Sequence, residues 1–164
     1  MAAEKVMYKA EGFRAPDPVM DKELELGILG GCLLSPDLAA AACEVLEAED
    51  FSSPRCRSLF GAVQRGNETA DCDRRPLADR IATTENAKRL FMIEAMSEYT
   101  AEAPSGDAYA ACLRRLKLQS AKRKAAREAW LILCDASHDD ADAEAFAAYI
   151  GQRMSGIAEA ISKL

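Results

Sequence analysis

Closely spaced carboxylates are the residues of this chain whose types and spacing come nearest to an acid–base site. One group is Glu47, Glu49 and Asp50, and another is Asp71 and Asp73. General acid–base catalysis needs a carboxyl group with a perturbed pKa, usually one in an apolar pocket. Both groups fall at expected helix ends and loops, with no such pocket indicated nearby. We therefore interpret them as helix caps and solubilising charges.

Nucleophilic, redox and metal chemistry have equally little support. The six cysteines form no Cys-x-x-Cys pair, and the single histidine, His138, falls in an expected turn. Zinc ligands come in tighter pairs, and a serine or cysteine nucleophile needs a base. The cysteines are typical of small buried side chains in a reducing, cytoplasmic environment. We expect no catalytic residue, no cofactor and no metal.

One basic stretch is a candidate contact for an acidic partner or for nucleic acid. Its candidate residues are Arg114, Arg115, Lys122, Arg123 and Arg127. The chain as a whole carries a formal net charge of −6, whereas a nucleic-acid-binding face needs net positive charge. A solvated helix face explains the stretch equally well. We expect a partner's acidic surface before DNA.

We expect all of these residues to lie on helices or in the turns between them. Hydrophobic residues make up 49% of the chain but aromatic residues only 6%, and the apolar positions recur at spacings of three and four. This composition and period favour an all-α fold. No apolar run reaches the roughly 18 residues of a membrane span, and no signal peptide is recognisable, so we expect no membrane association.

The chain divides into three expected segments. Residues 1–17 predict a flexible arm, residues 18–103 a compact multi-helix head, and residues 104–164 a long antiparallel helical hairpin. Within the head, Ser35-Pro36 and Ser53-Pro54 predict helix starts, because serine caps a helix and proline fits its first turn.

Four glycines in the head carry structural predictions. Gly27, Gly30 and Gly31 lie in an expected central helix, where each costs helix stability. Such a cost suggests a close approach by a neighbouring helix. Gly66 is expected to end a later helix in a left-handed conformation.

The hairpin is expected to associate with a second copy. Two helices that pack only against each other are marginal in water, and docking against a second hairpin would complete a four-helix bundle. The expected self-association residues are Tyr109, Leu113, Leu116, Trp130, Phe146, Ile150, Met154 and Ile157.

The head also contains a specific series of motifs. They are Glu-Leu-Glu-Leu-Gly-Ile-Leu-Gly at 23–30, Leu-Leu-Ser-Pro at 33–36, Glu-Asp-Phe at 49–51 and Pro-Arg-Cys-Arg-Ser-Leu-Phe at 54–60. With the downstream layout, residues 18–160 resemble the amino-terminal domain of DnaB-type replicative DNA helicases.

The resemblance implies a non-catalytic interaction domain in DNA replication. In that family these domains pair through their hairpins, build a trimer-of-dimers collar, and dock primase or a helicase loader in the primosome, with DNA contacted only indirectly. The chain contains no Gly-x-x-x-x-Gly-Lys-Ser/Thr motif, so we expect it not to hydrolyse ATP. Two alternatives stay open. One is a stand-alone regulator, for example from a phage, that binds a helicase collar, and the other is a small DNA-binding protein that uses residues 114–127.

Overall fold

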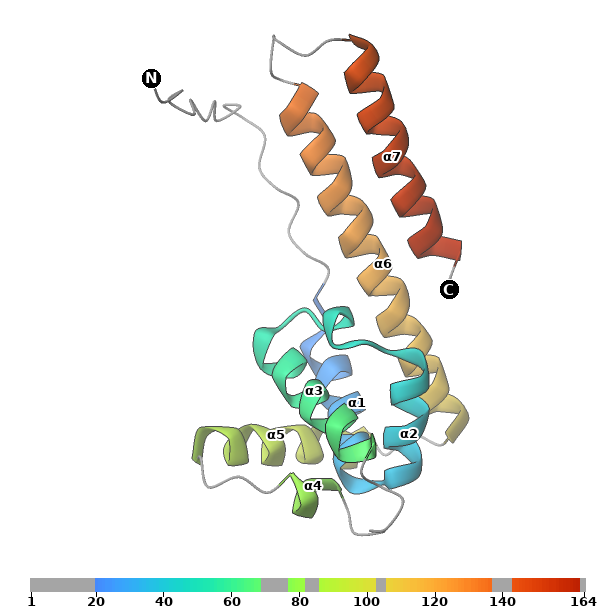
Figure 1. The fold of residues 1–164 in the computed structure, drawn as a ribbon. Coiled ribbons are helices and arrows are strands. Elements are labelled where there is room, and N and C mark those ends of the chain that lie inside the picture. Colours follow the sequence, from blue (N-terminus) through green and yellow to red (C-terminus); the bar gives the residue numbers. More distant parts are fainter. Residues whose placement is uncertain (1–19, 69–76, 82–85, 103–105, 137–142, 163–164) are drawn as a thin grey trace. The chain divides into compact units, whose positions relative to one another are not determined.

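Helices make up all the regular secondary structure of the described residues. The computed structural model describes residues 20–68, 77–81, 86–102, 106–136 and 143–162, and no strand occurs among them (Figure 1). The prediction of an all-α fold is confirmed. The predicted arm at 1–17 and the turn containing His138 lie outside the described residues.

The described residues form two compact units that divide inside one helix. The helices, in order, are α1 (Lys22–Leu34), α2 (Pro36–Val45), the short 3-10 helix η1 (Ala48–Asp50), α3 (Pro54–Glu68), α4 (Leu77–Arg80), α5 (Asn86–Glu102), α6 (Gly106–Ala136) and α7 (Ala143–Ser162). The head unit extends from Pro18 to Lys122, and the second unit takes the rest of α6 and α7.

The two predicted Ser-Pro helix starts are confirmed. Ser35 Oγ accepts a hydrogen bond from the backbone N–H of Leu38, at 3.4 Å, and Pro36 opens α2. Ser53 Oγ accepts from the backbone N–H groups of Arg55 and Cys56 at the start of α3. These caps turn the chain sharply twice, so that α1, α2 and α3 pack on one another.

Helix α1 is the centre of the head, as its apolar pattern predicts. It packs most extensively against α5. A Cβ at Gly30 would overlap the carbonyl oxygen of Ala95 on α5, and one at Gly31 would lie 2.7 Å from the Tyr109 ring. The predicted close approach is confirmed at these two glycines. It is wrong at Gly27, where a Cβ would meet nothing.

The predicted helix end at Gly66 is also wrong. Helix α3 continues through this glycine to Glu68. A Cβ at Gly66 would lie 2.7 Å from a methyl group of Leu77, so the glycine makes room for the first residue of α4. The residue serves packing rather than chain reversal.

The first part of α6 belongs to the head and not to the second unit. Tyr109, Leu113 and Leu116 are at most 3% exposed and pack in the head core. The Tyr109 hydroxyl donates a 2.8 Å hydrogen bond to the carbonyl oxygen of Ile28 in α1. The structural division thus falls after Lys122, whereas the sequence places it near residue 104.

The second unit contains residues 123–136 of α6 and helix α7. Its two segments run in opposite directions side by side (Figure 1), and Arg153 Nη1 donates a 2.6 Å hydrogen bond to Glu128 Oε2 between them. The same guanidinium lies 5.1 Å from the centre of the Tyr149 ring. Pairing of the two helices over the whole predicted hairpin stays a prediction.

Candidate functional site

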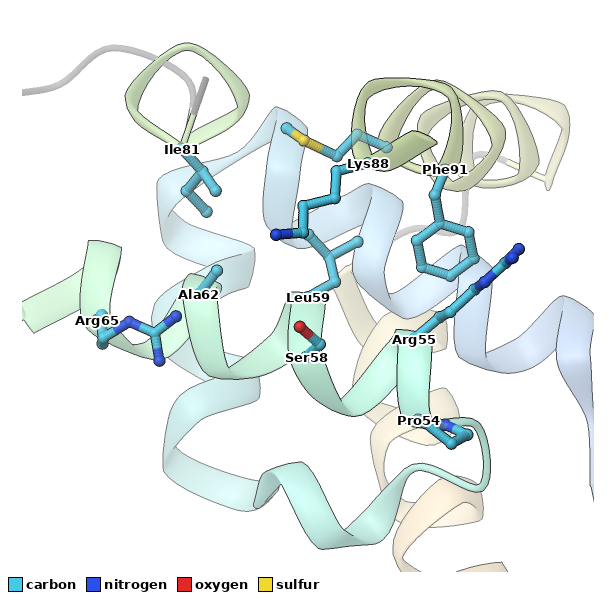
Figure 2. Close-up of a pocket in the computed structure, with 10 residues that line it drawn as sticks. Pro54, Arg55, Ser58, Leu59, Ala62, Arg65, Ile81, Lys88 and Phe91 are labelled. Atoms are coloured by element: carbon cyan, nitrogen blue, oxygen red, sulfur yellow. The ribbon is translucent and has the colours of Figure 1, made fainter. Parts of the chain in front are cut away.

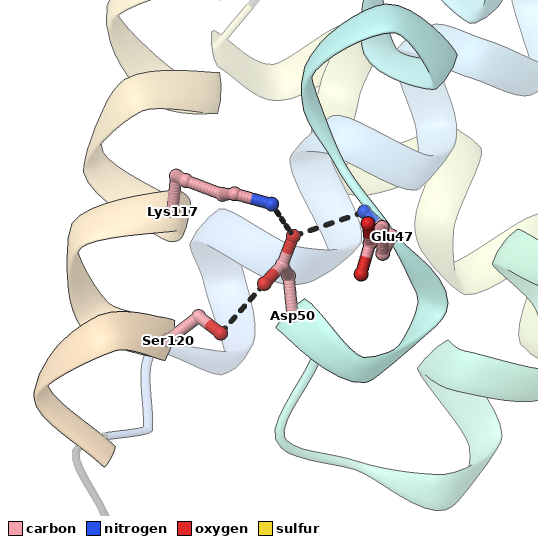
Figure 3. A network of polar contacts seen from close by, with 4 residues as sticks. All are labelled: Glu47, Asp50, Lys117 and Ser120. Atoms are coloured by element: carbon pink, nitrogen blue, oxygen red, sulfur yellow. Dashed lines mark hydrogen bonds and ion pairs between the residues drawn. The ribbon is translucent and has the colours of Figure 1, made fainter. Parts of the chain in front are cut away.

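Asp50 is the most enclosed charged group in the described residues, and it comes from the Glu-Asp-Phe motif. Its side chain is 0% exposed. The carboxylate accepts 2.6 Å hydrogen bonds from Lys117 Nζ and Ser120 Oγ, and a 2.9 Å bond from the backbone N–H of Glu47 (Figure 3). Lys117 and Ser120 thus connect η1 to α6, whereas the Glu47 amide closes the turn of η1 itself.

The charge state of Asp50 follows from these contacts. Burial by itself opposes ionisation of the carboxyl group. The hydrogen bonds from Lys117, Ser120 and Glu47, together with the lysine charge, outweigh burial and lower the Asp50 pKa below its ordinary value. An ionised carboxylate held by three donors stabilises structure. It is a poor general acid at neutral pH.

Two buried cysteines of the head are equally unsuited to nucleophilic chemistry. Cys32 and Cys56 are buried, and burial raises the pKa of each thiol to about 12. Neither is a thiolate at neutral pH. No group of three or more His, Cys, Asp or Glu side chains among the described residues is arranged to hold a metal ion.

The basic candidates on α6 are placed differently from one another. Arg115 pairs with Asp21 at 2.6 Å, so its charge is partly neutralised by the cap of α1. Arg114, Lys122 and Arg127 are exposed, and Arg123 is half-buried. Arg114, Arg115 and Lys122 belong to the head unit, and Arg123 and Arg127 belong to the second unit.

Apolar side chains of the second unit are left accessible. Trp130, Phe146, Ile150 and Ile157 are only half-buried, and Met154 is 52% exposed. None of the described side chains between Arg123 and Ser162 is buried. Of the eight expected self-association residues, these five are accessible, whereas Tyr109, Leu113 and Leu116 lie in the head core.

A groove of about 560 Å³ opens on the head between α3 and α5 (Figure 2). Its lining residues are Pro54, Arg55, Ser58, Leu59, Ala62, Arg65, Ile81, Lys88, Phe91 and Met92. The floor is apolar and three of the lining side chains are cationic. Among the described residues no acidic side chain lines it.

Comparison with known families decides what kind of domain this is. The family described as the DnaB-like helicase N terminal domain matches residues 17–117 of the 164-residue chain. The chain belongs to this family. No curated protein and no solved structure matches the chain.

The DnaB-like match explains why the motifs of the head resist interpretation as a reaction centre. Glu25 and Asp50, from two of these motifs, are buried and hydrogen-bonded, and Glu25 Oε1 accepts a 2.7 Å bond from the backbone N–H of Ser52. Phe51 packs on Phe60 with ring centres 4.9 Å apart. The motifs therefore encode the packing of the DnaB-like head, and the matched range ends before the second unit begins.

Two features of this DnaB-like domain are not predicted from its sequence. The Asp50–Lys117 pair joins residues far apart in the chain, and no local pattern marks such a pair. The groove has a fainter signal, since Arg55, Ala62 and Arg65 recur along one side of an amphipathic helix. That spacing alone does not say which helix faces it.

No helix among the described residues is long and apolar enough to span a membrane.

Proposed function

We propose that this chain is a non-catalytic interaction and oligomerisation domain of a replicative DNA helicase. In this role it forms part of the amino-terminal collar as a dimer or trimer of dimers. It also docks primase or a helicase loader during DNA replication in the cytoplasm. DNA is contacted only indirectly.

The accessible apolar surface of the second unit is the single observation that carries the proposal. A stable pair of helices buries a continuous apolar stripe, yet no described side chain from Arg123 to Ser162 is buried. Exposed apolar patches of this kind mark contacts with other protein chains. Trp130 and Phe146 supply the large aromatic groups that commonly anchor such contacts.

Membership of the DnaB-like family supports the same role. The family match covers the amino-terminal domain and includes no ATPase domain. Asp50 is buried and ion-paired, and burial keeps the thiols of Cys32 and Cys56 un-ionised at neutral pH. A scaffold function accounts for both observations.

The oligomeric state of the purified chain tests the proposal. Light scattering coupled to gel filtration, at tens of micromolar chain, should give at least twice the monomer mass of 17.8 kDa. A mass of 17.8 kDa at every concentration would refute self-association.

Direct DNA binding through residues 114–127 is the second candidate function. Arg114, Lys122 and Arg127 are exposed and favour it. The net charge of −6 and the pairing of Arg115 with Asp21 oppose it. Titration of labelled oligonucleotides at low and moderate salt decides, because phosphate contacts weaken steeply as salt rises. Salt-sensitive binding would support the DNA-binding function, and no binding would remove it.

A further inference from the structure

Arg153 of α7 contacts both helices of the second unit. Its Nη1 donates a 2.6 Å hydrogen bond to Glu128 Oε2 of α6, and the two side chains are 36% and 27% exposed. The guanidinium carbon lies 5.1 Å from the centre of the Tyr149 ring, one turn earlier on α7. That ring stacks at 22° to the Phe146 ring, with ring centres 6.3 Å apart. The arginine thus connects α6 with an aromatic pair on α7.

The ion pair lies in the least exposed stripe of α7. The half-buried members among the described side chains of this helix are Phe146, Tyr149, Ile150, Arg153 and Ile157. These positions lie on one face of a helix, as expected for a face that packs against a neighbour. Arg153 is the charged member of the stripe, and its partner Glu128 is half-buried as well. A charged pair therefore stands where the pattern would place two apolar side chains.

The apolar side chains of α7 do not by themselves define its alignment with α6. Spacings of four, four and three residues separate Phe146, Ile150, Met154 and Ile157. A shift of α7 by one turn, about 5.4 Å, would bring each of them close to the earlier position of its neighbour. Since none of the described side chains of the second unit is buried, no tightly packed core among them opposes such a shift.

The ion pair forms in one alignment only. Arg153 is the sole lysine or arginine within α7, from Ala143 to Ser162. A shift of one turn, about 5.4 Å, would leave Arg153 and Glu128 without their counter-ions in partly buried positions. In coiled coils a single polar residue inside an apolar interface specifies the alignment of the helices for the same reason.

We propose that Arg153 is a positioning residue, which fixes the alignment of α7 with α6 through Glu128. The two helix segments are antiparallel (Figure 1), so this pairing puts Trp130 at the height of Gly151, one residue from Ile150. The alignment thus decides whether Trp130 and Ile150 lie together on the surface offered to a second copy. The inference rests on the proposed self-association and names a residue that determines the shape of its contact surface.

Exchange of the two charges tests the role of the pair in association. Arg153→Glu and Glu128→Arg each place like charges together and should weaken association about fivefold. The double variant restores an ion pair in the opposite sense and should return to within about twofold of the native chain. Gln152→Glu is the control, because it adds a negative charge at an exposed site beside Arg153 and leaves the pair in place. Its effect, measured like the others by light scattering over a concentration series, should be below about twofold.

A carbodiimide crosslink reads the alignment independently of association. Arg153→Lys supplies an amine at the pair, which the reagent joins to the Glu128 carboxylate as an amide. Ile157→Lys supplies an amine on the same stripe, about 6 Å further along the helix. Mass spectrometry of the denatured chain separates links within one chain from links between chains. Because of that offset, it should find the link to Glu128 about fivefold more often in Arg153→Lys than in Ile157→Lys.

Two results would overturn the inference. One is an equal yield of the Glu128 link in Arg153→Lys and Ile157→Lys, which would show that α7 has no single alignment. The other is a double variant that associates as weakly as the single variants. The proposed self-association fails separately. A chain that keeps a mass of 17.8 kDa at every concentration, but forms the link preferentially in Arg153→Lys, would refute association and support the alignment.

Discussion

Lys117 donates a 2.6 Å hydrogen bond to the carboxylate of Asp50, a fully buried side chain 67 residues away in sequence. The contact joins the Glu-Asp-Phe motif to the helix that leaves the head. Lys117 itself is 23% exposed, so the pair is largely withdrawn from water. Breaking such a pair leaves a charge without its counter-ion in a poorly solvated place.

We expect Asp50→Ala to lower the free energy of unfolding by about 3 kcal/mol. The change removes the acceptor of Lys117, Ser120 and the Glu47 amide together. Urea unfolding followed by circular dichroism measures it. Asp37→Ala is the control, because Asp37 is exposed in the first turn of α2, and its cost should stay below about 1 kcal/mol. Equal costs would show that the Asp50 contacts add nothing.

The same contacts predict a pH dependence. The folded-state pKa of Asp50 is lowered, so its contribution to stability is present above the unfolded-state pKa of about 3.9 and is lost as pH falls through the folded-state value. Unfolding free energies of the native chain and of Asp50→Asn should therefore differ most at neutral pH and converge in acid. A difference that grows on acidification would contradict the sign of this shift.

Two glycines on α1 offer a matched packing test. Gly30→Ala places a methyl group against the Ala95 backbone, which has no side-chain freedom to yield, and should destabilise the head by about 3 kcal/mol. Gly27→Ala meets open space in the middle of the same helix and should stabilise it by about 0.5–1 kcal/mol. Thermal unfolding of the two variants measures whether each substitution raises or lowers the stability of the head. A stabilising Gly30→Ala would refute the close approach of α1 and α5.

Tyr109→Phe tests the attachment of α6 to the head core. The hydroxyl donates to the Ile28 carbonyl at 2.8 Å and lies 3.3 Å from the Cys32 sulfur. Its removal should cost about 1 kcal/mol in urea unfolding. Tyr99→Phe is the control, since that ring packs edge-on against Tyr109 and its hydroxyl has no hydrogen bond within the described part of the chain. We expect it to be close to neutral, and a larger loss in the control would contradict this account.

Local sequence signals predict the local structure of this head well. Ser35 and Ser53 cap the helices that they are expected to cap, because a cap depends on residues within one turn. The predicted helix end at Gly66 is wrong because a glycine near a helix end can either reverse the chain or make room for a neighbouring side chain. Here the neighbour is Leu77, which the local pattern does not reveal.

The local sequence pattern does not predict which segments pack together over long range. The stripe of Tyr109, Leu113 and Leu116 has the period of a buried face, but a period does not name the surface that covers it. The head covers it in this chain. Asp50 likewise fits the pattern of a helix-capping acid. The sequence does not show that Lys117 and Ser120 donate hydrogen bonds to its carboxylate.

Self-association through the second unit is the central claim, and one pair of variants tests it most directly. Met154 on α7 and Ile93 on α5 are almost equally exposed, at 52% and 53%. Met154→Glu should reduce the light-scattering mass to 17.8 kDa, because it places a charge in the proposed apolar contact. Ile93→Glu should leave the mass at twice that value or more. A native chain that is monomeric at tens of micromolar, or a mass lost in Ile93→Glu and kept in Met154→Glu, would contradict the account.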